Sequence, residues 1–171
     1  ARIVKRTHPE ATFRVVGPYD TNPSAIKPEE IEKGVADGAI EYIGELKDVT
    51  PQLNACMVFV LPSYHEGTPK TVLEAMATGR PVITTDVPGC RAAVQDGENG
   101  YLVPAKNAEA LADKMIYMLE HYDKVVELGN NGRILAEEKY DAVKVNRSIL
   151  DIMEIPYKLD KPMPYKEDIA V

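Results

Sequence analysis

Two glutamates, Glu66 and Glu74, have the residue type and the spacing that could carry chemistry in this sequence. They stand eight positions apart in EGTPKTVLEAMATGRPV, around a Gly-Thr-Pro turn. Carboxylates accept hydrogen bonds from sugar hydroxyls, so the pair could flank a polyhydroxylated ligand. The spacing alone is better explained by two ordinary acids, one favoured near a helix start by the helix dipole and one solvated. Against this, Glu74 lies in VLEAMA, where we expect packing against a sheet and where an unpartnered buried carboxylate is costly.

A helix is expected to begin between the two acids. Thr68 is a good N-cap residue, Pro69 suits the first helical position, and no helix breaker follows until Gly79. The helix follows an apolar strand that ends at Leu61. Its positive end therefore lies at the carboxyl edge of the sheet, where open α/β folds bind ligands.

The turn itself suits an anion. Gly67 lets backbone N–H groups approach an anion closely, because no Cβ stands in the way. Glu66 precedes the helix, and Glu74 lies roughly 9 Å along its axis at about 1.5 Å per residue. The stretch therefore predicts a phosphate cradle with a carboxylate on either side.

The remaining sequence indicates the elements that position this turn. Apolar runs alternate with helical patterns, which is the sequence form of a parallel α/β sheet with helices on both faces. The run Cys56–Leu61 is apolar throughout, as a central strand should be. The predicted strands are Thr12–Gly17, Ile40–Ile43, Cys56–Leu61, Val82–Thr84 and Gly100–Val103, and the predicted helices are Pro28–Asp37, Val49–Ala55, Pro69–Thr78, Ala92–Gln95, Ala108–His121, Tyr122–Lys139 and Ala142–Met153.

The two ends of the chain depart from this alternation. The first residues look like the end of a helix leading to a strand, whereas a βα domain normally opens with a strand. We therefore expect a fragment whose first strand is missing, with residues 1–153 as one domain. Residues 154–171 include two prolines in three residues and are expected to be extended or disordered.

Composition argues against several classes of protein. A net charge of −7, with dispersed basic residues, argues against a nucleic-acid partner. No segment approaches the roughly 20 apolar residues of a membrane span, and the N-terminus has no signal-peptide core. Two cysteines, one in an apolar run, fit reduced thiols and a cytoplasmic location. His8, His65 and His121 show no ligand spacing, so no metal site is expected.

The wider pattern resembles a known family. The stretch SYHEGTPKTVLEAMATGRPVITTDVPGCRAAVQDGENGYLVP is similar to the E-x7-E signature region of retaining GT-B glycosyltransferases of family 4, also called group 1. The similarity extends from about Ile3 to Lys139. The glutamate spacing is weak alone, but EG-x-P, EAMA-x-G-x-PV, D-x-PG and NG-x-LV occur in order. The resemblance implies a Rossmann-like C-terminal domain, the half of a two-domain enzyme that binds the nucleotide-sugar donor.

The resemblance also implies roles for residues. By position, Glu74 matches the carboxylate that binds the ribose hydroxyls of the donor, and Glu66 matches the one that contacts the transferred sugar. The implied contacts with sugar and diphosphate come from the turn and the first helical residues, namely Gly67, Thr68, Lys70 and Thr71. The implied contacts near the base and at the same sheet edge are Ile43, Gly44, Leu46 and Gly17.

The implied reaction is hexosyl transfer from a UDP- or GDP-sugar to a glycan or lipid-linked acceptor, in bacterial surface-polysaccharide synthesis. Glu66 is the positional candidate for a nucleophile, but we favour a front-face route in which the leaving phosphate assists the incoming hydroxyl. No D-x-D occurs, so neither a metal nor another cofactor is expected. The acceptor-binding domain is expected in a missing N-terminal half, with possible peripheral membrane association through that half. This fragment should therefore be inactive alone.

Two other functions stay open at this point. One is a non-catalytic module that binds a nucleotide sugar, and the other is a nucleotide-sugar epimerase of the same GT-B architecture. The motifs G-x-G-x-x-G and G-x4-G-K-[ST] are absent, which argues against NAD-binding and P-loop functions.

Overall fold

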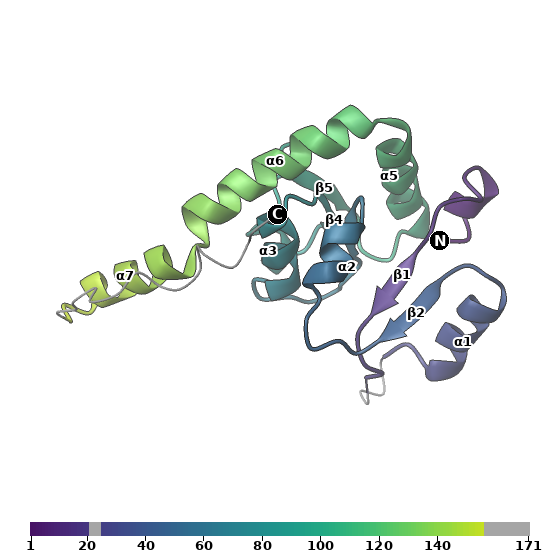
Figure 1. Ribbon diagram of the computed structural model, residues 1–171, viewed down its shortest axis with the longest axis horizontal. Coiled ribbons are helices and arrows are strands. Elements are labelled where there is room, and N and C mark those ends of the chain that lie inside the picture. The colour runs from purple at the N-terminus through teal and green to yellow at the C-terminus, as the bar shows by residue number, and fades with distance from the viewer. Residues whose placement is uncertain (21–24, 156–171) are drawn as a thin grey trace.

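The computed structural model describes residues 1–20 and 25–155 and has the predicted α/β architecture (Figure 1). Parallel strands alternate with helices, and a long helix follows near the C-terminal end. The strands are β1 (Arg14–Val16), β2 (Glu41–Gly44), β3 (Phe59–Leu61), β4 (Val82–Thr85) and β5 (Gly100–Val103). The helices are the 3-10 turn η1 (Val4–Arg6), α1 (Pro28–Ala36), α2 (Thr50–Ala55), α3 (Lys70–Ala77), α4 (Pro88–Arg91), α5 (Ala108–Glu120), α6 (Tyr122–Lys139) and α7 (Ala142–Ile152).

The described strands form two parallel sheets rather than one. In the first, β1 pairs with β2, and in the second the order is β3-β4-β5. Every residue of β4 is buried, whereas those of β3 are only half-buried. The prediction that Cys56–Leu61 is a central strand is therefore wrong for the described residues, since β4 holds that position and β3 lies at an edge.

Two predicted boundaries also differ. The apolar run begins as strand only at Phe59, because the amide of Cys56 still bonds to the carbonyls of Gln52 and Leu53 at the end of α2. The short helix predicted at Ala92–Gln95 lies earlier, at Pro88–Arg91, because proline is well placed in the first turn of a helix.

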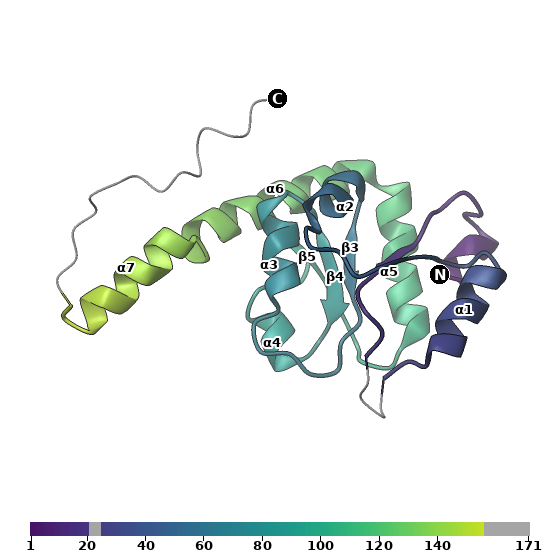
Figure 2. The same ribbon diagram turned by 60° about the horizontal axis from the view of Figure 1, so that its bottom comes forward.

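Helices cover both faces of the three-stranded sheet (Figure 2). On one face, Val82 packs with apolar residues of α2, α3 and α6. On the other face, Ile83 and Val103 pack with Met118 of α5 and Leu128 of α6. Alternate residues of β4 thus serve opposite cores, as the side-chain period of two along a strand requires.

The two-stranded sheet is held to the rest by its flanking segments. Helix α1 lies against β2, and a Cβ at Gly34 would lie 3.0 Å from the side chain of Ile40, which precedes that strand. The buried Val4 of η1 lies against α5, and His8 Nε2 is 3.6 Å from a carboxylate oxygen of Glu120.

Helix α7 extends away from the body of the molecule (Figure 1). It has a strongly apolar side, yet none of its residues is buried. Asp141 caps its start by accepting hydrogen bonds from the amides of Val143 and Lys144. Within residues 1–20 and 25–155, no helix is both long and apolar enough to span a membrane. Most of the tail predicted for residues 154–171 lies outside the described residues.

Candidate functional site

The loop from β3 to α3 holds the turn singled out in the sequence. Glu66 is half-buried, Gly67 and Thr68 are exposed, and the ring of Pro69 is buried. Helix α3 begins at Lys70, directly after this turn. The turn therefore places the helix N-terminus at the carboxyl end of β3, as predicted.

The prediction that Thr68 caps this helix is wrong. The N-cap position belongs to Pro69, whose φ of −70° and ψ of 118° are extended, and no described side chain caps α3. The Pro69 carbonyl accepts the first helical bonds, from the amides of Val72 and Leu73 at 3.1 and 3.3 Å. A proline supplies a carbonyl but no side-chain acceptor. The amides of Lys70 and Thr71 therefore have no partner inside the helix.

The first residue of α3 carries a positive charge. Lys70 Nζ lies 3.3 Å from Glu74 Oε1, one helical turn further along. The Lys70 side chain is 87% exposed and that of Glu74 34% exposed, so Glu74 is neither buried nor unpartnered. Thr71, also predicted as a phosphate contact, is exposed beside them. These residues thus surround the uncapped end of α3.

The residues predicted near the base and at the same sheet edge lie at the ends of β1 and β2. The amide of Gly17 donates to the carbonyl of Gly44 at 2.9 Å, and Tyr42 Oη donates to the Gly17 carbonyl at 2.9 Å. Both glycines have positive φ, 142° and 82°, which β-branched or bulky residues rarely adopt. Ile43 is exposed and Leu46 half-buried in the adjoining segment.

The two groups belong to different sheets. Glu66 and its turn follow β3, whereas Gly17 and Gly44 end β1 and β2. Each group therefore follows the carboxyl ends of its own parallel strands.

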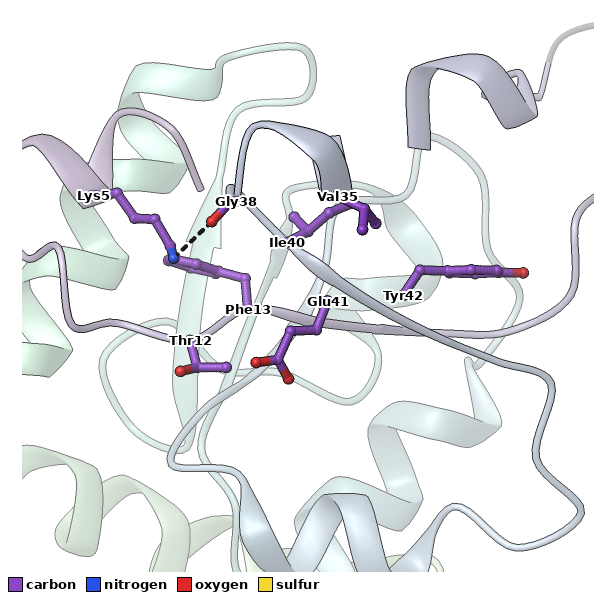
Figure 3. A pocket seen from close by; sticks show the side chains of 8 residues that line it. All are labelled: Lys5, Thr12, Phe13, Val35, Gly38, Ile40, Glu41 and Tyr42. Carbon is purple, nitrogen blue, oxygen red and sulfur yellow. Dashed lines mark hydrogen bonds between the residues drawn. The ribbon is translucent and has the colours of Figure 1, made fainter. Parts of the chain in front are cut away.

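A cavity of about 430 Å³ lies elsewhere, at the amino ends of β1 and β2 (Figure 3). Lys5 crosses its edge and donates from Nζ to the Gly38 carbonyl at 2.8 Å. The segment from Thr12 to Phe13 precedes β1, so this cavity lies at the sheet edge opposite the predicted ligand edge. None of the predicted site residues lines it.

The sequence alone assigned no role to the residues of β4 and α4 that pack against the turn. A Cβ at Gly89 would lie 1.8 Å from the Gly67 carbonyl oxygen. Thr84 and Thr85, at the end of β4, donate hydrogen bonds to the carbonyls of Leu61, the last residue of β3, and of Ser63 in the loop that follows. The D-x-PG part of the sequence pattern was the signal that could have pointed to Gly89.

Comparison with known proteins identifies the family. Residues 1–121 match the family described as glycosyl transferases group 1. A Campylobacter jejuni N,N'-diacetylbacillosaminyl-diphospho-undecaprenol α-1,3-N-acetylgalactosaminyltransferase is 37% identical over 122 residues, which are 71% of this chain and 31% of that protein. The lipopolysaccharide core mannosyltransferase LpsB of Rhizobium meliloti is 29% identical over 82% of this chain and 40% of its own length. The chain thus spans between 31% and 40% of the length of these two relatives.

Solved structures agree with this match. Anabaena HepE, crystallised with UDP, superposes with a TM-score of 0.79 at 22% identity, over 85% of this chain and 41% of HepE. The C-terminal domain of the group 1 glycosyltransferase LpcC from Francisella tularensis superposes with a TM-score of 0.72 at 28% identity, over 82% of this chain and 75% of that domain. The chain therefore belongs to the group 1 glycosyltransferases and has the fold of their C-terminal GT-B domain.

Proposed function

We propose that this chain is the donor-binding half of a retaining glycosyltransferase that uses a nucleotide-diphosphate sugar. The observation that carries the proposal is the uncapped N-terminus of α3, which starts directly after the Glu66–Gly67 turn at the carboxyl end of β3. The N-terminus of a helix attracts anions through its free amides and its dipole. A donor diphosphate bound there has Glu66 on the sugar side and Glu74 on the ribose side.

The charge at the start of α3 supports a phosphate ligand. Helix stability favours acidic residues in the first turn, yet α3 has none there and begins with Lys70. A lysine at this position disfavours the helix slightly and favours a bound anion. With the amides of Lys70 and Thr71, it supplies the positive field that would hold a diphosphate without a metal ion.

The base of the nucleotide is proposed to bind at a separate position, the ends of β1 and β2. The linked backbones of Gly17 and Gly44, with Ile43 and Leu46 beside them, form a rigid end to β1 and β2. Backbone groups held in this way recognise the edge of a flat base without large side-chain movements. The nucleotide would then extend from this edge to the turn at Glu66.

In the proposed reaction, Glu66 stabilises charge and orients the transferred sugar. The bond between the anomeric carbon and the diphosphate breaks as the acceptor oxygen approaches from the same face, and the leaving phosphate takes the proton of the acceptor hydroxyl. The amides of Gly67 and Thr68 stabilise the developing charge on that phosphate. No protein nucleophile is needed on this route.

The names of the relatives support the substrate class. The Campylobacter protein acts on an undecaprenol-linked acceptor, and the Rhizobium protein is a mannosyltransferase of lipopolysaccharide core synthesis. A Staphylococcus aureus relative belongs to capsular polysaccharide biosynthesis. We therefore propose hexosyl transfer to a glycan or lipid-linked acceptor in the cytoplasm. A further N-terminal domain would bind the acceptor and could associate with the membrane surface.

Nucleotide binding by residues 1–171 tests the proposal directly. UDP, UDP-glucose and GDP-mannose are each titrated by calorimetry and by thermal unfolding, with and without EDTA. A ligand at 100 times its Kd should raise the melting temperature by about 5–10 °C, and EDTA should leave the Kd unchanged. The chain alone should transfer no sugar. Binding of none of the three nucleotides would overturn the proposal, and release of free epimerised sugar nucleotide would favour an epimerase.

A further inference from the structure

Gly89, in the short helix α4, lies directly behind the Glu66–Gly67 turn. A Cβ at this position would lie 1.8 Å from the carbonyl oxygen of Gly67 and 2.1 Å from that of Glu66. Both contacts are with backbone atoms, which cannot rotate away as a side chain can. Of the 20 amino acids, only glycine fits without moving this turn.

The position of the two carbonyls determines where the neighbouring amides point. In a trans peptide the C=O and N–H groups lie in one plane and point in opposite directions. The carbonyl oxygens of Glu66 and Gly67 both lie against Gly89, so α4 limits how the two peptide planes that carry the Gly67 and Thr68 amides can turn. Two successive amides directed to one side form the kind of concavity that binds anions.

The end of β4 holds the last residue of β3 and the start of the loop that leads to this turn. The hydroxyl of Thr84 donates to the Leu61 carbonyl at 2.8 Å, and the hydroxyl of Thr85 donates to the Ser63 carbonyl. Both threonines are buried, with exposures of 0% and 3%. The end of β3 and the loop that follows it are therefore supported by β4 and α4.

We propose that Gly89 is a positioning residue of the donor site, which acts by turning the amides of Gly67 and Thr68 toward the donor diphosphate. The proposal rests on the function proposed above. Replacing Gly89 by alanine pushes the turn away from α4 and changes the direction of both amides. The loss then falls on diphosphate binding as well as on stability.

A matched pair of variants separates positioning from simple overpacking. The second position is Gly129 of α6, where a Cβ would lie 2.3 Å from the Gly79 carbonyl oxygen, in the turn after α3. Gly89→Ala and Gly129→Ala should both lower the melting temperature. Gly89→Ala should weaken UDP binding, measured by calorimetry on folded protein, about tenfold or more, whereas Gly129→Ala should leave the Kd within about twofold. Equal Kd values for the two variants would overturn the proposal.

Backbone amide chemical shifts give a readout that does not need the nucleotide. In Gly89→Ala the 15N and 1H shifts of Gly67 and Thr68 should move, whereas Gly129→Ala should leave them in place. If wild-type protein does not bind UDP, the proposed function fails for uridine donors, and these shifts alone decide the positioning role. Unchanged shifts at Gly67 and Thr68 would refute it.

A second position keeps the test open if Gly89→Ala does not fold. Thr85→Val removes the hydroxyl that donates to Ser63 while keeping the shape of the side chain, and Thr85→Ser restores a hydroxyl. UDP binding should weaken in Thr85→Val and return to within about twofold of wild type in Thr85→Ser. Full binding by Thr85→Val would show that the loop needs no support from β4 and would count against the proposal.

Discussion

Lys70 and Glu74 form an ion pair, Nζ to Oε1 at 3.3 Å, between the first residue of α3 and the residue one turn later. The donor-binding proposal gives each partner a different part of the ligand, the diphosphate and the ribose. The ion pair holds both side chains on the same side of the helix. The donor would therefore bind where the positive charge of Lys70 and the hydrogen-bond acceptor of Glu74 already lie beside each other.

Glu74→Ala should weaken nucleotide binding and barely change stability. Loss of a hydrogen bond to a charged group reduces affinity about 10- to 100-fold. An exposed helical ion pair contributes at most about 0.5 kcal/mol to folding. Calorimetry with UDP and urea unfolding measure the two effects. The matched control is Glu137→Ala, which breaks an i,i+4 pair with Arg133 on α6 and should leave UDP affinity unchanged. Unchanged affinity in Glu74→Ala would remove the ribose role.

Lys70→Ala should weaken diphosphate binding without lowering stability. A positive charge at a helix N-terminus opposes the helix dipole, which costs about 0.3–1 kcal/mol, and the ion pair with Glu74 offsets part of that cost. The free energy of unfolding should therefore stay equal or rise slightly. UDP should lose more affinity than uridine, since uridine has no phosphate. Equal losses for both ligands would contradict a phosphate contact.

Thr68→Ala should leave stability nearly unchanged. Loss of a true N-cap costs about 1 kcal/mol, but the structure gives the N-cap position of α3 to Pro69. Asn107, whose side chain accepts from the Ala110 amide at 2.9 Å, is the matched control because it caps α5. Urea unfolding should show about 1 kcal/mol lost in Asn107→Ala and less than about 0.5 kcal/mol in Thr68→Ala. A loss in Thr68→Ala as large as in Asn107→Ala would restore Thr68 as the cap.

The sequence predicted α3 well because its signals are local. Apolar spacing, a proline and the following glycine are read along a few residues, and each determines nearby backbone conformation. The one-residue error at Thr68 has the same origin. Thr68 and Pro69 are both compatible with a helix start, and the choice between them depends on how the turn packs, since Pro69 is buried.

The supporting residues could not be predicted in the same way. Gly89 and Gly67 are 22 positions apart, and their contact arises because the strands before them are neighbours in a parallel sheet. The residues next to Gly89 in the sequence do not show whether another backbone segment packs closely against this glycine or whether it only forms a turn. The family resemblance included the D-x-PG motif of this region. A motif does not tell which backbone atoms pack against its glycine.

Stability should fall at acid pH partly through Asp37. The Arg2 guanidinium hydrogen-bonds to this carboxylate at 2.8 Å and lowers its pKa below the ordinary value of 3.8. A carboxyl whose pKa is lower in the folded state stabilises the fold above pH 3.8, and this contribution is lost as pH falls through the folded-state pKa. Urea unfolding at pH 7 and at stepped values below 4 measures the effect. Asp37→Asn should be less stable than wild type at pH 7, and this difference should disappear toward pH 2; a constant difference would contradict the linkage.

The edge of β3 that faces away from β4 should exchange its backbone amide hydrogens rapidly. Phe59 donates its amide to the Pro81 carbonyl at 3.0 Å, so backbone alternation directs the Val60 amide away from β4. No described strand pairs with that side of β3, although apolar edges of this kind are normally covered. The six-strand order of doubly wound folds places a strand between those corresponding to β1 and β3.

In residues 1–171, hydrogen exchange followed by NMR should therefore be fast at Val60 and slow at Phe59. In a longer protein whose additional residues form a strand beside β3, the Val60 amide should become as slow as that of Phe59. Slow exchange at Val60 in the present chain, or fast exchange in the longer one, would show that no further strand pairs with this edge.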